Sequence, residues 1–291
     1  MLEFLRGRDV LVAGWGISGR SLVEPLRDIG ARPVVTDGGA AALAEAAGLG
    51  LDIATCVELE TTDWSRFALV ITSPGWRPDS PVLAAAVAEG TPVWGDVEFA
   101  WWVDQARIYG PVRKWLVVTG TNGKTTTTQM THAILRAAGI PSVACGNIGL
   151  PILDALRRNP GPQVLAVELS SFQLHWAPSV RPEAGVVLNV AEDHLDWHGG
   201  LDAYAAAKAR ALVAGSAWSG STIRWRPRWP VARKPGAPSA SGSACPPTVS
   251  SAWSTANCST ARSPRPRSSP RSATSARPAR PVSPTRSPRP R

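Results

Sequence analysis

The sequence predicts an α/β protein with a Rossmann-like N-terminal domain, an incomplete P-loop-type parallel α/β central domain and a disordered tail. Three observations lead to this fold class. Short apolar runs alternate with segments of helical periodicity, a glycine-rich turn twice separates such a run from a helix, and both patterns stop near residue 215. We therefore expect domains over residues 1–110 and 111–215, followed by a tail over residues 216–291.

The first series of elements predicts a parallel sheet. An apolar run at residues 9–14 ends in glycine, and Leu22, Leu26 and Ile29 then follow at helical spacing before a second run at residues 33–37. This order is a β-α-β unit. A further strand, helix and strand are expected at residues 68–72, 80–89 and 92–94.

The second series repeats the alternation after residue 110. We expect strands at residues 115–119, 142–145, 164–168 and 185–189, and helices at residues 125–138 and 201–213. In open sheets of this kind, ligands bind beyond the carboxyl ends of the strands. The residues that follow each strand are therefore the first candidates for a site.

The tail has a composition of its own. Residues 216–291 hold 14 of the 31 Lys and Arg and none of the 22 Asp and Glu, so the first 215 residues, with 17 basic and 22 acidic side chains, carry a net charge of −5. A Ser-, Pro-, Arg- and Ala-rich segment buries too little apolar surface to fold, which predicts disorder. Its tryptophans, Trp218, Trp225, Trp229 and Trp253, are unusual for such a tail. We hypothesise a frameshift, which the genomic sequence past codon 213 would test.

Composition also limits the class of protein. Cys56, Cys145, Cys245 and Cys258 show no close pairing, the N-terminus lacks a secretory signal, and no apolar run approaches the roughly 18 residues of a membrane span. We expect a soluble, cytoplasmic, monomeric protein. A nucleic-acid-binding protein is an alternative that rests on the basic tail alone. Such binding would depend steeply on salt and would not read sequence.

The first glycine-rich turn is Gly-Trp-Gly-Ile-Ser-Gly at residues 14–19, between a strand and a helix, with Asp37 at the end of the next strand. The spacing fits a dinucleotide-binding fingerprint, in which glycines admit a phosphate to the helix N-terminus. A NAD-dependent oxidoreductase is one interpretation. A tight β-α turn with no ligand is another, and the residues of this turn do not decide between them.

The second glycine-rich turn favours a nucleoside triphosphate. Its backbone N–H groups can surround phosphates, the Lys124 ammonium can reach the terminal phosphates, and the Thr125 hydroxyl can bind Mg²⁺. A strict P-loop has glycine where this chain has Val118. The residues that we expect to bind the nucleotide are Gly120, Thr121, Asn122, Gly123, Lys124, Thr125 and Thr126.

Two further side chains follow apolar strands near this turn. Glu168 ends one strand and His194 follows another, so the two could hold a second cation, although Asp193 or Asp196 could serve equally well. A helix cap or a solvated charge is the alternative for Glu168. For Lys208, sequence alone predicts a solvated lysine on a helix.

Taken together, these motifs resemble the Mur ligase family. The resemblance rests on residues 119–126, on Glu-Leu-Ser-Ser-Phe-Gln-Leu at residues 168–174 and on Asn-Val-Ala-Glu-Asp-His-Leu-Asp at residues 189–196. Ser-Pro-Gly at residues 73–75, Gly-Asp-Val-Glu-Phe at residues 95–99 and Gly-Asn-Ile-Gly at residues 146–149 fall in the order of the D-glutamate-adding branch. The resemblance covers residues 8 to about 213.

The resemblance implies a ligand set. The first domain would bind the uridine nucleotide of UDP-N-acetylmuramoyl-L-alanine instead of NAD, and the second would bind ATP with two Mg²⁺ ions before D-glutamate is added. The implied substrate-binding residues are Ile17, Ser18, Asp37, Ser73, Gly75 and Asn147. The implied catalytic residues are Lys124, Lys208, Asn147 and His194, and the implied metal-binding residues are Thr125, Glu168, His194 and Lys208.

In that family the lysine at the position of Lys208 is carbamylated, and the reaction passes through an acyl phosphate. Complete family members continue through the rest of the ATP domain into a third domain, which residues 216–291 do not resemble. We therefore expect the chain as written to expose apolar surface and not to complete the reaction. Phosphate release that depends on ATP and D-glutamate would contradict that expectation.

Overall fold

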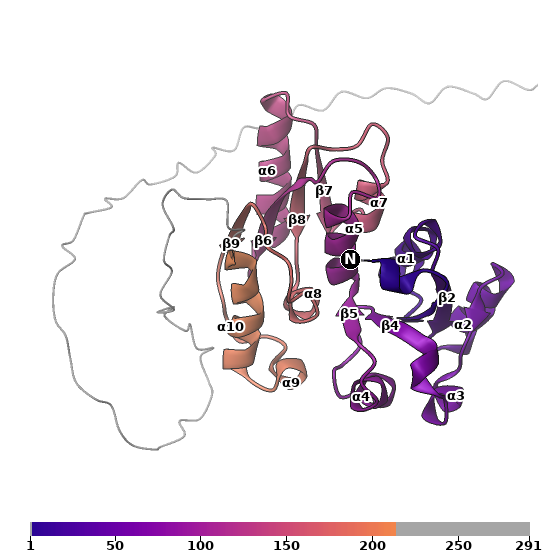
Figure 1. The fold of residues 1–291 in the computed structure, drawn as a ribbon. Helices are drawn as coiled ribbons and strands as arrows, with labels where there is room; N and C mark the ends of the chain where they lie inside the picture. The colour runs from indigo at the N-terminus through magenta and orange to yellow at the C-terminus, as the bar shows by residue number, and fades with distance from the viewer. Residues whose placement is uncertain (1, 214–291) are drawn as a thin grey trace, which may run out of the picture. The chain divides into compact units, whose positions relative to one another are not determined.

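The protein is described by a computed structural model over residues 2–213, which form two parallel sheets with helices on their faces (Figure 1). The predicted α/β class is confirmed. The predicted disordered tail and its tryptophans lie outside the described residues. No helix within residues 2–213 is long and apolar enough to cross a membrane.

The first sheet has the strand order β3-β2-β1-β4-β5, with every neighbouring pair parallel. Its strands are β1 (Asp9–Ala13), β2 (Arg32–Thr36), β3 (Asp52–Ile53), β4 (Phe67–Thr72) and β5 (Val93–Gly95), and its helices are α1 (Ile17–Asp28), α2 (Ala40–Gly48), α3 (Cys56–Glu60) and α4 (Pro81–Ala88). Val10 to Ala13 of the central strand are fully buried, because helices cover both faces of this sheet. The β-α-β unit predicted from residues 9–37 is confirmed.

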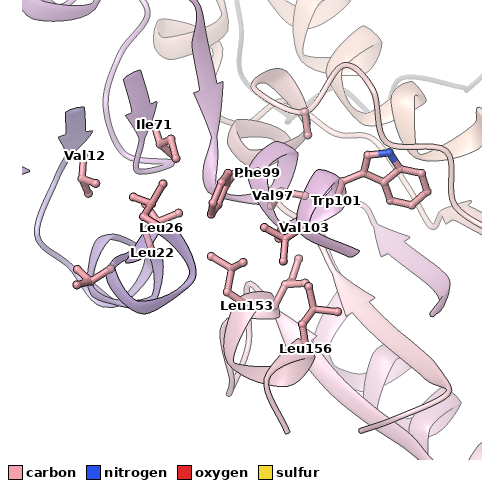
Figure 2. Packing of buried hydrophobic residues seen from close by; sticks show 14 of the residues in the cluster. Val12, Leu22, Leu26, Ile71, Val97, Phe99, Trp101, Val103, Leu153 and Leu156 are labelled. Atoms are coloured by element: carbon pink, nitrogen blue, oxygen red, sulfur yellow. The ribbon is translucent and has the colours of Figure 1, made fainter. Parts of the chain in front are cut away.

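Helix α5 (Asp96–Gln105) follows the first sheet and was not predicted. Figure 2 shows Phe99 and Val103 of α5 between Leu26 of α1 and Leu153 of α7 (Ile152–Leu156). All four side chains are buried in one apolar cluster. Because almost all of α5 is buried, its sequence shows no amphipathic periodicity from which a helix could be predicted.

The second sheet has the order β7-β8-β6-β9, again with all neighbours parallel. Its strands are β6 (Lys114–Thr119), β7 (Ser142–Gly146), β8 (Val164–Glu168) and β9 (Ala184–Val187), and its further helices are α6 (Lys124–Ala137), α8 (Ser171–His175), α9 (Leu195–His198) and α10 (Leu201–Ala209). The predicted helix 201–213 ends at Ala209 and continues as a 3-10 turn, Arg210–Leu212. Helices α7, α8 and α9 have only four or five residues, too few for a period to be recognised.

The strand order places the candidate site. Because β6 lies between β8 and β9, the loop after β6 has the carboxyl ends of both neighbours beside it. Leu169, just after β8, donates its N–H to Val118 O at 3.0 Å, and Leu188, just after β9, donates to Thr119 O at 2.9 Å. Residues far apart in sequence are thus fixed next to the glycine-rich turn.

Candidate nucleotide and metal site

The loop between β6 and α6 takes a backbone shape that depends on two glycines. Gly120 has φ +154°, and a Cβ there would lie 3.1 Å from Leu188 Cβ. Gly123 has φ +84° and is the residue before α6 begins. Val118, where the strict motif has glycine, is a buried residue of β6. Gly120 and Gly123 therefore supply the positive φ angles that the loop requires, and Val118, which lies in the strand, is compatible with the loop.

Asn189 holds this loop from the end of the neighbouring strand. Its backbone O accepts from Thr121 N at 3.0 Å, its Oδ1 accepts from Asn122 N at 2.9 Å, and its Nδ2 donates to Asn122 O at 3.0 Å. The loop is therefore preorganised, and the first N–H groups of α6 have no partners within the helix. Sequence reasoning gave Asn189 no role. Its position directly after an apolar strand was the available signal.

Two lysines lie under the loop. Lys124 Nζ donates to Thr121 O at 3.0 Å, and Lys208 Nζ donates to Gly120 O at 2.9 Å. Only 2% of Lys208 is exposed, and Nζ lies 4.6 Å from the ring centroid of Tyr204. The prediction of a solvated lysine was wrong, because Tyr204, Ala207 and Lys208 form the buried face of α10. Burial, followed by the nearby Lys124 charge, lowers the pKa of Lys208 to about 8, while Asp193 opposes the shift.

Tyr204 connects α10 to the loop. Its hydroxyl lies 2.9 Å from Thr121 Oγ1, and the same Oγ1 accepts from Ala191 N at 3.0 Å. Tyr204 is buried. The loop, the segment after β9 and α10 thus form one hydrogen-bonded unit, in which Tyr204 is a second residue that sequence reasoning missed.

Glu168 ends β8 opposite Val118 of β6 and is only 1% exposed. One carboxylate oxygen, Oε1, accepts from Asn147 Nδ2 at 3.0 Å, and Oε2 has no hydrogen-bond partner within residues 2–213. Glu168 is therefore neither a solvated charge nor a helix cap. A buried oxygen without a partner is costly, and carboxylate oxygens are ligands that Mg²⁺ prefers.

His194 is the residue before α9 and has a left-handed backbone, with φ +51°. Its Nε2 lies 3.5 Å from Asp193 Oδ2, and its ring centroid is 4.7 Å from that of Phe172. The part of the chain that the structure describes contains no group of three His, Cys, Asp or Glu side chains that could hold a metal ion. A cation bound by Glu168 would need ligands of other kinds.

Two residues predicted from the sequence to bind substrate make hydrogen bonds that hold the first glycine-rich turn. Asp37 Oδ2 accepts from Trp15 N at 2.7 Å, and its Oδ1 accepts from Gly39 N at 2.8 Å. Ser73 Oγ donates to Gly14 O at 3.2 Å, and a Cβ on Gly14 would lie 2.6 Å from that Oγ. Asp37 and Ser73 therefore fix the turn, and Gly75 lies on the same loop as Ser73.

A pocket of about 200 Å³ lies between the start of α1 and the turn after β7. Ile17, which is 75% exposed, and Ser18 line it from the start of α1, and Asn147 lines it from the turn after β7. Asn147 in turn contacts Glu168. The structure thus brings residues predicted for the uridine nucleotide close to residues predicted for the metal.

Comparison with known proteins agrees with this geometry. Residues 118–223 match the sequence family described as the Mur ligase middle domain. The matched range includes every residue described above from Gly120 to Lys208, and its last residues lie outside the described structure.

Three relatives bear the name UDP-N-acetylmuramoylalanine–D-glutamate ligase. The chain is 93% identical over 213 residues to that of Nocardia farcinica, 63% over 215 residues to that of Rhodococcus jostii, and 59% over 207 residues to that of Mycobacterium avium. These alignments cover 73%, 73% and 71% of this chain, and 44%, 43% and 42% of the relatives. The chain therefore spans less than half the length of these relatives. The oxidoreductase alternative finds no support in these matches.

Proposed function

We propose that this chain carries the ATP site and the UDP-substrate site of a Mur ligase that adds D-glutamate to UDP-N-acetylmuramoyl-L-alanine. The observation that carries the proposal is the Gly120 loop, held by Asn189 with the Lys208 ammonium buried beneath it. The names of the relatives support the choice of D-glutamate and of the uridine-linked acceptor.

ATP is proposed to bind with its phosphates at the N-terminus of α6. That helix has 14 residues, so the unpaired N–H groups of its first turn and its dipole favour an anion. Lys124 Nζ now contacts a carbonyl of its own loop, Thr121 O. Phosphate oxygens are stronger acceptors for an ammonium group, and we propose that Lys124 turns to the terminal phosphates.

The residues present fit Mg²⁺. The Thr125 hydroxyl is exposed at the start of α6, and Glu168 offers the buried oxygen without a partner. When bound, Mg²⁺ would offset the negative charge that otherwise slows phosphoryl transfer between anions. We propose Thr125 for one ion, and Glu168 with His194 and a modified Lys208 for the second.

The modification proposed for Lys208 is a carbamate. The neutral Nζ attacks the carbon of CO₂, an N–C bond forms, the electron pair of one C=O bond moves to its oxygen, and Nζ loses a proton. Burial and the adjacent Lys124 favour the neutral amine that this step requires. The product is an anion, which would add oxygen ligands where the described residues supply too few.

The proposed reaction has two steps. A carboxylate oxygen of the alanine attacks the γ-phosphorus, the bond from that phosphorus to the β-bridging oxygen breaks, and ADP leaves. The amine of D-glutamate then attacks the acyl carbon, phosphate leaves with the bonding electron pair, and the nitrogen loses a proton. Lys124 stabilises the transferring phosphoryl group, while Asn147 and His194 orient the acyl end.

Thermal shift measurements on the purified chain test the two binding sites. We expect UDP to raise the melting temperature and NAD⁺ to leave it unchanged, because the matches favour a uridine substrate. Mg²⁺ with a nonhydrolysable ATP analogue should give a further rise, since the two sites are separate. Stabilisation by NAD⁺ without stabilisation by UDP would overturn the proposal in favour of an oxidoreductase.

A further inference from the structure

One carboxylate in the pocket between the start of α1 and the turn after β7 has no role in the reaction proposed above. Asp96 is the first residue of α5, directly after β5, and it lines the 200 Å³ pocket together with Ile17, Ser18, Asn147 and Gln173. Its Oδ1 is buried and has no hydrogen-bond partner within residues 2–213. Buried polar atoms are nearly always paired, so this oxygen needs an explanation.

A purely structural role accounts for only part of the side chain. A carboxylate in the first turn of a helix is stabilised by the helix dipole, and Asp96 occupies that position in α5. Burial raises the pKa of Asp96, while Ser18, the Val97 N–H and Gln173 oppose that rise. None of these neighbours pairs with Oδ1. One acceptor of a residue that lines the pocket therefore remains unpaired.

The lining of the pocket indicates what Oδ1 would bind. Among the described residues that line the pocket, Asp96 is the only ionisable one, and the others are Gly, Ile, Pro, Ser, Asn and Gln. Since none of these described side chains is cationic, the pocket disfavours a diphosphate or a carboxylate. A ligand group with hydroxyl or amide N–H donors suits a lone carboxylate among neutral polar side chains.

The size and position of the pocket narrow the choice further. Sites that enclose a whole drug-sized ligand measure roughly 300–1,000 Å³, so about 200 Å³ fits one part of a larger ligand. On one side lie Ile17 and Ser18, proposed for the uridine nucleotide, and on the other lies Asn147, which contacts Glu168. The part of the proposed substrate between these ends is its N-acetylated amino sugar.

We propose that Asp96 binds the amino sugar of the substrate, with Oδ1 accepting a hydrogen bond from a sugar hydroxyl or from the acetamido N–H. This inference rests on the proposed function, because it uses the uridine nucleotide to place the sugar. It assigns Asp96 to substrate binding and specificity, and not to the chemical steps.

Calorimetric titration of the full chain with UDP and with UDP-N-acetylglucosamine tests the proposal. The ratio of the two dissociation constants isolates the contribution of the sugar. In the unmodified chain we expect UDP-N-acetylglucosamine to bind roughly tenfold more tightly than UDP, as one hydrogen bond to a charged group implies. Asp96→Ala should remove most of that difference and leave the UDP dissociation constant within about twofold.

Two further variants keep the test decisive. Asp96→Asn retains the shape of the side chain and one acceptor oxygen, so it can replace the alanine variant if that variant fails to fold. It should weaken the binding of UDP-N-acetylglucosamine and leave the binding of UDP unchanged. Asp52→Asn changes an exposed aspartate on β3 and should change neither constant.

Each other outcome is decisive as well. An equal loss for both ligands in Asp96→Asn would show a structural role, and an unchanged ratio in either folded variant would also overturn the proposal. If UDP binds to the unmodified chain and UDP-N-acetylglucosamine binds no more tightly, the inference about Asp96 is wrong, while the proposed uridine site stands. Failure of both ligands to bind would refute the proposed uridine site itself.

Discussion

Lys208 shows why a single residue can mislead when only the sequence is read. Its neighbours along α10 are alanines, which give no indication of the buried face, so a solvated lysine was the reasonable expectation. The burial arises from tertiary packing of α10 against α8 and from the Gly120 carbonyl that accepts from Nζ. The Mur ligase resemblance drew attention to this position, whereas composition and spacing did not.

Carbamylation of Lys208 can be observed directly. Because its pKa is lowered to about 8, a much larger fraction of the Lys208 amine is neutral at pH 7.5 than of an exposed lysine. We expect a carbamate resonance in the ¹³C NMR spectrum of the chain in ¹³C-bicarbonate. The resonance should be absent from Lys208→Ala and present in Lys114→Ala. A carbamate resonance that persists in Lys208→Ala would assign the modification elsewhere.

His198 is a second residue whose environment has a measurable consequence. It stacks on Phe172, and burial, followed by the charge of His175, lowers its pKa to about 4. The unfolded chain therefore binds a proton near pH 6.5, where the folded chain does not. Above about pH 6.5 the imidazole is neutral in both states, and His198 costs the fold no stability. As the pH falls from about 6.5 towards 4, protonation of the unfolded chain lowers the free energy of unfolding.

Urea unfolding at pH 7.5 and pH 5.0 measures this effect. We expect the loss of stability on acidification to be smaller in His198→Gln, whose longer amide side chain can still hydrogen-bond Ser171 Oγ, the present partner of Nε2. Equal acid sensitivity in the variant and the unmodified chain would show that His198 does not contribute.

Among the elements, every strand except the two-residue β3 was predicted, whereas α2, α5 and the short helices were not. Residues 10–13 and 164–167 are continuous apolar runs, as expected where both faces of a sheet are covered, and such runs are readily recognised. Helices α7 to α9 have four or five residues, and α5 is buried nearly all round. Asn189 and Tyr204 were missed for a related reason, since their roles depend on the strand order, which local sequence does not specify.

Gly16, directly before α1, and Gly19, within α1, provide a test of how this helix packs against the glycine-rich turn. A Cβ on Gly19 would lie 1.9 Å from Gly14 O, so α1 could not stay at its present distance from the glycine-rich turn. We expect Gly19→Ala to lower the free energy of unfolding by about 1–3 kcal/mol and to abolish UDP binding. Gly16→Ala, whose Cβ meets nothing within 4 Å, should cost at most about 1 kcal/mol. Equal effects would contradict this packing.

Across the whole molecule, the segment that joins the two sheets is fixed by a buried ion pair. Asp104 Oδ1 accepts from Arg113 Nη1 at 3.1 Å, and Asp104 Oδ2 accepts from Trp115 Nε1 at 2.9 Å. Arg113 also donates to Leu156 O, which connects β6 to α7. Burial raises the pKa of Asp104, and the Trp115 and Arg113 donors oppose that rise.

Removing one partner of this pair should be costly. We expect Asp104→Ala to destabilise the chain by about 3–5 kcal/mol in urea unfolding, because the Arg113 charge is left buried. Lys114→Ala removes an exposed ion pair with Glu183 and should cost less than about 1 kcal/mol. If Asp104→Ala cost no more than Lys114→Ala, the junction would not depend on the pair.

The same surface lysine provides the control for the central claim, that the Gly120 loop is the ATP site. Lys114 begins β6, whereas Lys124 begins α6 on the far side of the loop, and of these two lysines only Lys124 contacts the loop. Calorimetric titration of the chain with a nonhydrolysable ATP analogue should show one Mg²⁺-dependent site, weakened at least tenfold in Lys124→Ala and unchanged in Lys114→Ala. The absence of binding, or equal affinity in the unmodified chain and both variants, would contradict the account.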